Sequence, residues 1–162
     1  MKKPIIHIDL DGVVADFVGA INNHPLRKED YYKENPDEIP GIFRDLKMIP
    51  GAKEAVHFLL EQDCFEVYFL STAPWHNPSA WTDKRLWLEA HFGDKINRRL
   101  TISHRKDLII GDYLIDDRPN NGAKDFKGKL ITFGSAEFPN WEVVLKYFES
   151  KMKLFNSADG RS

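Results

Sequence analysis

The feature that most constrains the fold is a short apolar run near the N-terminus that ends abruptly in acidic residues. Residues 4–9 are Pro-Ile-Ile-His-Ile-Asp, a β-branched and almost continuously apolar stretch. Such a stretch is typical of a strand that is buried on both faces of a parallel sheet. It continues into Asp9-Leu10-Asp11-Gly12, where glycine can adopt backbone angles that other residues avoid. The pattern predicts a buried strand that turns at its carboxyl end and presents carboxylates there.

Strand and helix patterns then alternate along the rest of the chain. Further buried strands are expected at residues 65–70, 100–102, 113–116 and 129–133. Helices are expected from near Val14, over residues 52–62, from an Asn77-Pro78 cap to about Phe92, and over residues 141–152. This alternation indicates an α/β domain with a parallel sheet, in which ligands bind at the carboxyl ends of the strands.

One internal segment differs in composition from the domain around it. It is rich in proline and charged residues, and we interpret it as a short, partly helical insertion. The small polar residues at the C-terminus predict a flexible tail. The expected organisation is a main domain of residues 1–22 and 50–153, an insertion of residues 23–49 and a tail of residues 154–162.

Charge and cysteine content exclude several classes of protein. The 162 residues carry 23 Lys and Arg against 25 Asp and Glu, without a block of like charge. Nothing therefore points to a nucleic acid polymer or a membrane surface as partner. Cys64 is the single cysteine, which rules out an internal disulfide and a four-cysteine zinc site. We expect a cytoplasmic protein, and its many aromatic residues are compatible with a homodimer.

Polar side chains gather at the predicted strand ends. They are Asp9 and Asp11, Ser71 and Thr72, and Asp116 and Asp117. Two carboxylates 4 Å apart repel by roughly 4 kcal/mol in a medium of effective dielectric 20, and a divalent cation would remove that repulsion. A set of oxygen ligands without histidine or thiol favours Mg²⁺ over zinc.

Two other readings of these aspartates compete with a metal site. Aspartate most often forms turns and caps helices, which would explain Asp9 and Asp11 alone equally well. The pair Asp116-Asp117 at a second strand end favours the metal site instead. A calcium-binding loop starting at Asp9 is excluded because it needs different residue types at Val13, Val14 and Ala20.

The motifs resemble those of a known family. Asp9-Leu10-Asp11-Gly12-Val13 resembles the nucleophile motif of the haloacid-dehalogenase-like (HAD) hydrolase superfamily. Residues 49–52, 70–74 and 112–119 complete a pattern similar to the 5'(3')-deoxyribonucleotidase family, over Ile5 to about Phe148. The resemblance implies a Rossmann-like HAD fold: a central parallel sheet flanked by helices, with a small cap inserted after the first motif.

The resemblance also implies a mechanism. Asp9 would attack the phosphoryl group and become an aspartyl phosphate. Asp11 would protonate the leaving alcohol and then deprotonate the attacking water. Mg²⁺ would be held by the Asp9 carboxylate, the Asp11 backbone carbonyl and Asp116, with Asp117 binding directly or through water. Thr72, or else Ser71, would hydrogen-bond the phosphate.

The family also has a lysine near the phosphate, and the chain offers two candidates. Lys84 is on the otherwise apolar stripe of a predicted helix, which is unusual for lysine. The members of that stripe are Ala80, Trp81, Trp87, Leu88 and His91. Alternatively, Lys84 extends toward the helix end to reach water. Lys106 ranks second, because a solvated side chain is the commoner case for a loop lysine.

The expected substrate is a small phosphomonoester, with deoxynucleoside monophosphates implied by the resemblance. The insertion is shorter than the vertebrate cap. Aromatic residues in the insertion and near it in the sequence could stack on a base or simply serve packing, and the candidates are Phe17, Tyr31, Tyr32, Phe43 and Trp75. We expect Phe43 and Trp75 to contact the substrate. The alternatives are a general phosphatase for sugar phosphates, a mutase or phosphotransferase, and a HAD-like binding module without turnover.

Overall fold

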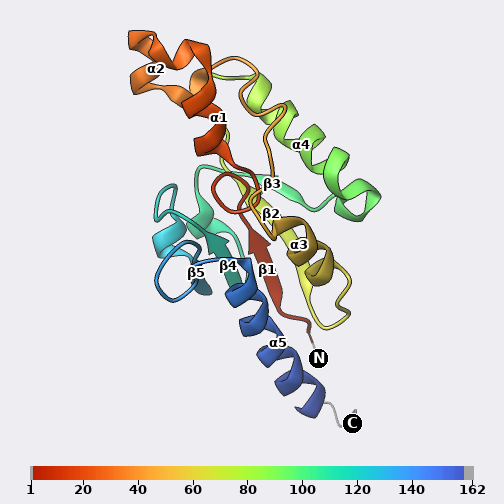
Figure 1. Cartoon of the computed structure of the whole chain (residues 1–162). Coiled ribbons are helices and arrows are strands. Elements are labelled where there is room, and N and C mark those ends of the chain that lie inside the picture. Colours follow the sequence, from red (N-terminus) through yellow and green to blue (C-terminus); the bar gives the residue numbers. More distant parts are fainter. Residues whose placement is uncertain (1, 159–162) are drawn as a thin grey trace.

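The computed structural model describes residues 2–158 and contains a five-stranded parallel sheet (Figure 1). The strands lie in the order β3-β2-β1-β4-β5, and every neighbouring pair is parallel. Their bounds are β1 Ile5–Ile8, β2 Glu66–Ser71, β3 Leu100–Ile102, β4 Tyr113–Asp116 and β5 Lys129–Thr132. The predicted α/β class and all five predicted strands are confirmed.

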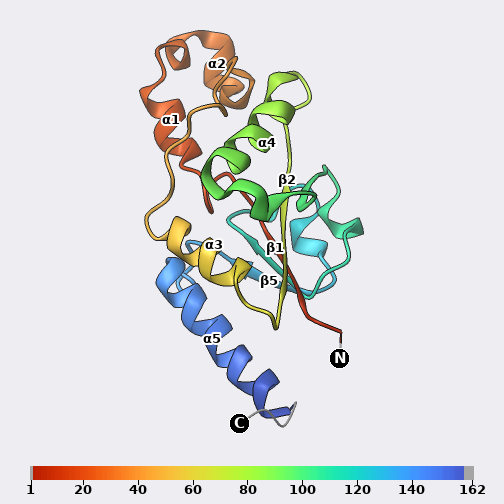
Figure 2. The same cartoon turned by 90° about the vertical axis from the view of Figure 1, so that its right-hand side faces the viewer.

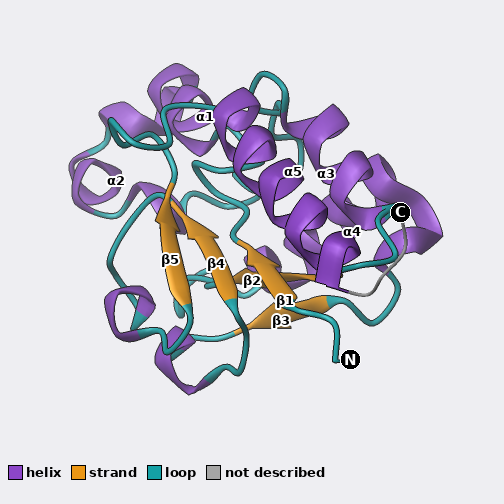
Figure 3. Cartoon of the chain, turned by 90° about the horizontal axis from the view of Figure 1, so that it is seen from below, coloured by secondary structure: helices purple, strands orange, loops and turns teal. Residues whose placement is uncertain are grey.

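Five α-helices accompany the sheet in the described part of the chain. They are α1 Phe17–Asn23, α2 Asp30–Glu34, α3 Ala52–Leu60, α4 Ser79–Phe92 and α5 Trp141–Ala158. Short 3-10 turns lie at Pro25–Lys28, Pro36–Glu38, Gly93–Ile96, Lys106–Leu108 and Ala123–Asp125. Helices α3 and α5 pack on the same face of the sheet, as the view from below shows (Figure 3).

The alternation of side chains along each strand separates two apolar cores. Ile6 and Ile8 of β1 are fully buried in the larger core, together with residues of α3, α4 and α5. Leu70 of β2 and Leu114 of β4 point to the opposite face and pack with Phe126. Because successive strand residues face opposite sides, a run that is apolar at nearly every position must be covered on both faces.

The strand order places a ligand crevice at the carboxyl end of the sheet. The chain starts in the central strand β1 and adds β2 and β3 on one side, then crosses to β4 and β5 on the other. The connections that follow β1 and β4 therefore diverge, which opens a crevice between them, and ligands of open α/β sheets bind at such a point. Asp9 follows β1, and Asp116 ends β4.

The segment between α1 and α3 rises beyond this edge of the sheet. Helix α1 leads up from this edge, and α2 lies at the far end of the segment in both side views (Figures 1 and 2). Its return path is anchored to α4: the indole nitrogen of Trp87 donates to the carbonyl of Leu46 at 2.8 Å. The Asn77 amide also donates to the carbonyls of Asp37 and Ile39, at 2.9 and 3.1 Å.

Three expectations about helix ends are wrong. Helix α1 begins at Phe17 rather than near Val14, because the Asp16 side chain caps it by accepting from the Gly19 N–H. Asn77 does not cap α4: the N-cap residue is Pro78, and the side-chain oxygen of Asn77 accepts from the Ser79 hydroxyl at 3.1 Å instead of from a backbone N–H. Helix α5 continues to Ala158, so residues 154–158 are not an irregular tail; residues 159–162 lie outside the described part.

Among the described residues, none of the helices combines the length and the apolar character that crossing a bilayer requires.

Candidate active site

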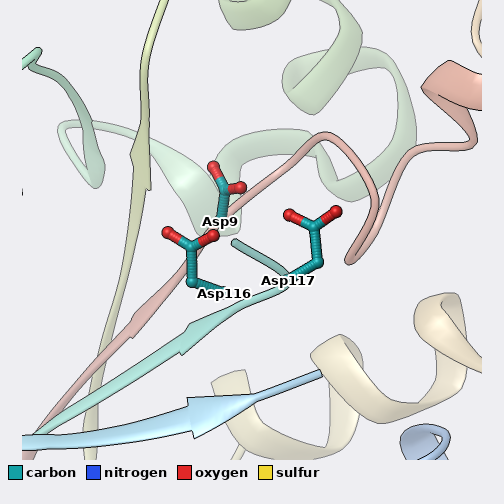
Figure 4. Close-up of side chains that lie close together, drawn as sticks. All are labelled: Asp9, Asp116 and Asp117. Carbon is teal, nitrogen blue, oxygen red and sulfur yellow. The ribbon is translucent and has the colours of Figure 1, made fainter. Parts of the chain in front are cut away.

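Three carboxylates converge at the crevice between β1 and β4. Asp9, Asp116 and Asp117 each place an oxygen within 4.8 Å of the others. Their side chains rise from adjacent strand ends into the same space (Figure 4). Asp9 and Asp116 are buried, and the Asp9 N–H donates to the carbonyl of Ile115 at 2.9 Å, which ties the turn after β1 to β4. The predicted meeting of the two acidic motifs is confirmed.

A buried lysine lies between two of these carboxylates. The ammonium nitrogen of Lys106 is 2.6 Å from Oδ2 of Asp116 and 3.2 Å from Oδ1 of Asp9. Lys106 is only 3% exposed, so the expectation of a solvated loop lysine is wrong. The short turn Lys106–Leu108 carries the side chain inward, and its backbone is tied by the Lys106 N–H to the carbonyl of Asn121.

Burial and neighbouring charges raise the pKa values of three groups at this site. Burial raises the pKa of Asp9 to about 7; Lys106 partly offsets that rise, whereas Asp116 and Asp11 add to it. Burial alone would lower the pKa of Lys106, but attraction to Asp9 and Asp116 outweighs it and raises that pKa. Burial also raises the pKa of Asp117. Even with a lysine present, the cluster is short of positive charge.

Gly12 allows the turn after β1 to pass close to Asp117. Its φ of +78° lies in the left-handed region that favours glycine. A Cβ atom at this position would lie 2.1 Å from Oδ2 of Asp117, which is far inside contact distance. Glycine is therefore needed both for the backbone angle and for the space that Asp117 occupies.

Lys84 forms a second buried cluster with Asp11 and Ser71. Its ammonium group contacts Oδ2 of Asp11 and lies 3.1 Å from Oγ of Ser71. Lys84 is 2% exposed, so it does not extend to water at the helix end, and the predicted inward stripe of α4 is confirmed at this position. Asp83 beside it is also buried, which sequence periodicity did not indicate.

Thr72 and Ser71 lie at the end of β2 but face different surroundings. Thr72 lines the cavity described below, and its hydroxyl donates to the carbonyl of Ser103 at 2.7 Å. That proton must turn toward a phosphate if the hydroxyl is to donate to it. Ser71 is fully buried and faces Lys84 instead.

A cavity of about 580 Å³ opens above the carboxylates. Asp9, Asp11, Lys106, Asp116 and Asp117 line its floor, whereas Lys84 and Ser71 are not among its lining residues. Phe43 and Trp75 are also among its lining residues. Phe43 is buried and stacks on Phe17, with ring centroids 5.1 Å apart. Trp75 is 73% exposed and lies beside His104.

Two of the aromatic candidates are not among the lining residues of this cavity. Tyr31 and Tyr32 pack against each other, and Tyr31 donates to Glu38. Other lining residues went unrecognised in the sequence because loop positions carry no periodic signal; they include His104, Arg118, Asn120 and Asn121. The Arg118 N–H donates to Oδ1 of Asp116 at 3.0 Å, which orients that carboxylate.

The donor set fits Mg²⁺ on chemical grounds. The grouped ligand atoms are all carboxylate oxygens, which hard cations prefer. Burial, and to a smaller extent Asp116 and Asp11, raise the pKa of Asp9 and so disfavour its charged form, which a dication would stabilise. Asp9, Asp116 and Asp117 are the residues that would hold it.

Comparisons with known proteins identify the family to which the chain belongs. A family model described as "5' nucleotidase, deoxy (Pyrimidine), cytosolic type C protein" matches residues 24–144. A protein of Vibrio phage KVP40, assigned as a 5'(3')-deoxyribonucleotidase, is 46% identical over 151 residues, covering 93% of this chain and 88% of its own. The human 5'(3')-deoxyribonucleotidase, cytosolic type, is 30% identical over 168 residues, covering 85% of this chain and 77% of its own.

A solved haloacid dehalogenase-like hydrolase from Burkholderia xenovorans LB400 superposes over 85% of both chains with a TM-score of 0.44 and 16% identity, which is too distant to add support. The sequence relatives and the family model do not depend on that superposition. Together they show that the chain belongs to the 5'(3')-deoxyribonucleotidase family of phosphatases.

Proposed function

We propose that the protein is a Mg²⁺-dependent phosphomonoesterase that acts on deoxynucleoside monophosphates through an aspartyl-phosphate intermediate. The observation that carries the proposal is the placement of Asp9, which is buried and shares the Lys106 ammonium group with Asp116, yet lines the cavity. The relatives named as 5'(3')-deoxyribonucleotidases support the substrate class.

In the first half of the reaction, an oxygen of Asp9 bonds to phosphorus as the bond from phosphorus to the ester oxygen breaks. Asp11 donates a proton to that oxygen, so the alcohol leaves neutral. In the second half, water attacks phosphorus and Asp11 accepts a proton from that water. The bond between phosphorus and the Asp9 oxygen breaks, which frees phosphate and restores the Asp9 carboxylate.

The positive groups of the chain attract the phosphate and hold the carboxylates. Lys106 keeps Asp9 and Asp116 side by side, since its ammonium group touches both. When bound at Asp9, Asp116 and Asp117, Mg²⁺ supplies charge that stabilises the phosphoryl group in the transition state. The Thr72 hydroxyl is placed to turn from Ser103 toward a phosphate oxygen.

We assign residues 23–49 as a cap that covers the substrate. Phe43 on its return path and the turn Pro36–Glu38 line the cavity walls, so the non-phosphate part of the substrate faces the cap. Exposed Trp75 offers a flat surface on which a base can stack. A cavity of about 580 Å³ has room for a nucleotide.

A substrate panel with Mg²⁺ tests the proposal: deoxynucleoside monophosphates, ribonucleoside monophosphates, sugar phosphates and an aryl phosphate. We expect the highest kcat/KM for a deoxynucleotide and trapping of radioactive phosphate on Asp9. The Asp9→Asn variant should lose activity by at least about a thousandfold, or about 4 kcal/mol. Hydrolysis of the aryl phosphate alone would contradict the nucleotidase assignment, and residual activity in Asp9→Asn would contradict covalent catalysis.

A further inference from the structure

A buried lysine in the structure has no part in the reaction as written above. Lys84 of α4 is 2% exposed and is not among the residues that line the large cavity. Burying an ammonium group is costly unless a partner compensates its charge. Packing alone does not account for a lysine at this position.

The partner of Lys84 is the acid–base group. The Lys84 ammonium contacts Oδ2 of Asp11, and the Ser71 hydroxyl lies on its other side at 3.1 Å. Oδ1 of Asp11 has no hydrogen-bond partner among the described residues, although it is buried. A buried acceptor without a partner is uncommon unless a ligand or water completes it. Lys84 thus holds Asp11 through one carboxylate oxygen, while the other has no protein partner.

The cap contacts the same lysine. The Lys84 ammonium lies 4.3 Å from the centroid of the Phe43 ring, within the range of a cation–π contact. Phe43 stacks on Phe17 almost in parallel, with an angle of 4° between the rings. Phe17 begins the helix that leads into the cap, and Phe43 lies on the path that leads out. The position of the ammonium group therefore depends on both connections of the cap.

We infer that Lys84 is a positioning residue that orients the Asp11 carboxyl group for proton transfer, and that Phe43 makes this orientation depend on the cap. The inference rests on the proposed function. When the bond from phosphorus to the ester oxygen breaks, the proton of Asp11 moves to that oxygen. The carboxylate that remains stays against Lys84 until it takes a proton from water. Lys84 keeps its own protons throughout.

The effect of the leaving group on the rate distinguishes a lysine that positions the acid from a lysine that binds phosphate directly. An alcohol with a high pKa must be protonated as it leaves, whereas p-nitrophenolate leaves readily as an anion. Loss of a residue that positions the acid therefore slows release of a deoxynucleoside much more than release of p-nitrophenol. Loss of a phosphate-binding lysine slows both equally and raises KM for both.

The experiment compares first-turnover product release by rapid quench, with Mg²⁺, in wild type, Lys84→Met and Lys84→Arg. For Lys84→Met we expect release of the deoxynucleoside to slow about a hundredfold, and release of p-nitrophenol by less than about threefold, in line with the size of acid–base effects. Lys84→Arg should recover part of the rate on the nucleotide. Lys53→Met, an exposed lysine of α3, is the matched control and should behave as wild type.

Phe43→Leu is a second variant that tests the inference if Lys84→Met does not fold. It removes the ring over the ammonium group but leaves an apolar side chain, and we expect a smaller loss with the same preference for the nucleotide. Equal losses on both esters in Lys84→Arg and Phe43→Leu would overturn the inference. Absence of turnover in the wild type on both esters would instead overturn the proposed function, and the inference with it.

Discussion

The ammonium nitrogen of Lys106 lies 3.2 Å from Oδ1 of Asp9, although Asp9 follows β1 and Lys106 precedes β4. The same ammonium group reaches Asp116 at 2.6 Å, so one buried cation joins two acidic strand ends. In a buried site, each charge of such a pair stabilises the ionised form of the other, and removing one leaves the other uncompensated. The reactivity expected of Asp9 therefore depends on Lys106.

Replacing Lys106 by methionine should lower kcat/KM on the preferred substrate by about 10²–10³-fold, the scale expected for loss of an electrostatic stabiliser. Without the ammonium group, Asp9 and Asp116 repel each other in a buried site. Steady-state kinetics with saturating Mg²⁺ would measure the effect. Lys124→Met changes an exposed lysine and serves as the control. An unchanged kcat/KM in Lys106→Met would show that Lys106 does not contribute to the reaction.

Mg²⁺ should stabilise the folded protein as well as activate it. A ligand that binds only the folded state adds about 2.7 kcal/mol when its free concentration is a hundred times Kd. We expect Mg²⁺ to raise the Tm of the wild type and to raise that of Asp117→Asn less at equal concentration. Thermal melts across a Mg²⁺ titration would check this. Identical shifts in both proteins would exclude Asp117 from the metal site.

Without divalent ions, the stability contribution of Asp9 should decrease as pH rises. Its pKa in the folded protein is about 7, above the ordinary value of 3.8. The unfolded chain therefore releases this proton at lower pH than the folded protein. Stability from Asp9 is fully present below its unfolded pKa and is lost as pH rises through about 7.

Thermal melts of wild type and Asp9→Asn in a chelator between pH 4 and 8 measure this contribution. We expect Asp9→Asn to gain Tm relative to wild type as pH rises, because its amide carries no charge to bury. Saturating Mg²⁺ should remove the trend by compensating the Asp9 carboxylate. A difference in Tm that stays constant over this pH range would contradict the raised pKa.

Trp75 should contribute to binding of the base but not to phosphoryl transfer. Stacking on an aromatic side chain is worth about 1–3 kcal/mol per base, so Trp75→Ala should raise KM for a deoxynucleotide about tenfold. The KM for a small sugar phosphate should stay the same, since it carries no base. Parallel KM measurements on the two substrates provide the internal control. An equal rise in both would mean that Trp75 does not contact a base.

Asn77→Ala should loosen the cap without unfolding the sheet. The Asn77 amide donates to the carbonyls of Asp37 and Ile39; in the variant the Asp37 carbonyl loses this donor, whereas the Ile39 carbonyl keeps the Ile42 N–H at 3.2 Å. Leaving a buried acceptor unpaired costs about 1–3 kcal/mol. Hydrogen exchange should become faster in residues 30–40 while β1 and β4 remain protected. Asn97→Ala, at an exposed position, should leave exchange unchanged.

The strands were predictable because their signal is local. Residues 5–8 are apolar at nearly every position, and the structure buries them on both faces as that pattern requires. Asp9 and Asp116 were predictable for a related reason: parallel strands bring their carboxyl ends to one edge, so acidic residues at those ends must meet. Lys84 was found by helical periodicity, which placed it correctly on the inner face of α4.

Contacts between loops were not predictable in the same way. Lys106 looked like an exposed loop lysine because its sequence neighbours are polar and charged, and the groups that bury it come from β1 and β4. Asn77 carried the signature of a helix cap, but its side-chain oxygen accepts from the Ser79 hydroxyl and its amide nitrogen donates to the inserted segment. Helix α5 passed its predicted end because residues such as Phe155 pack on the core.

The sequence by itself determined the α/β class, the family and the acidic residues of the site, because periodicity and motif spacing are properties of neighbouring residues. Only the tertiary structure decided which lysine touches which carboxylate: Lys106 reaches Asp9, whereas Lys84 reaches Asp11. That division depends on the paths of a loop and a helix through space. The interaction of two buried charges depends on their distance in the folded molecule, and that distance cannot be read from their separation in the sequence.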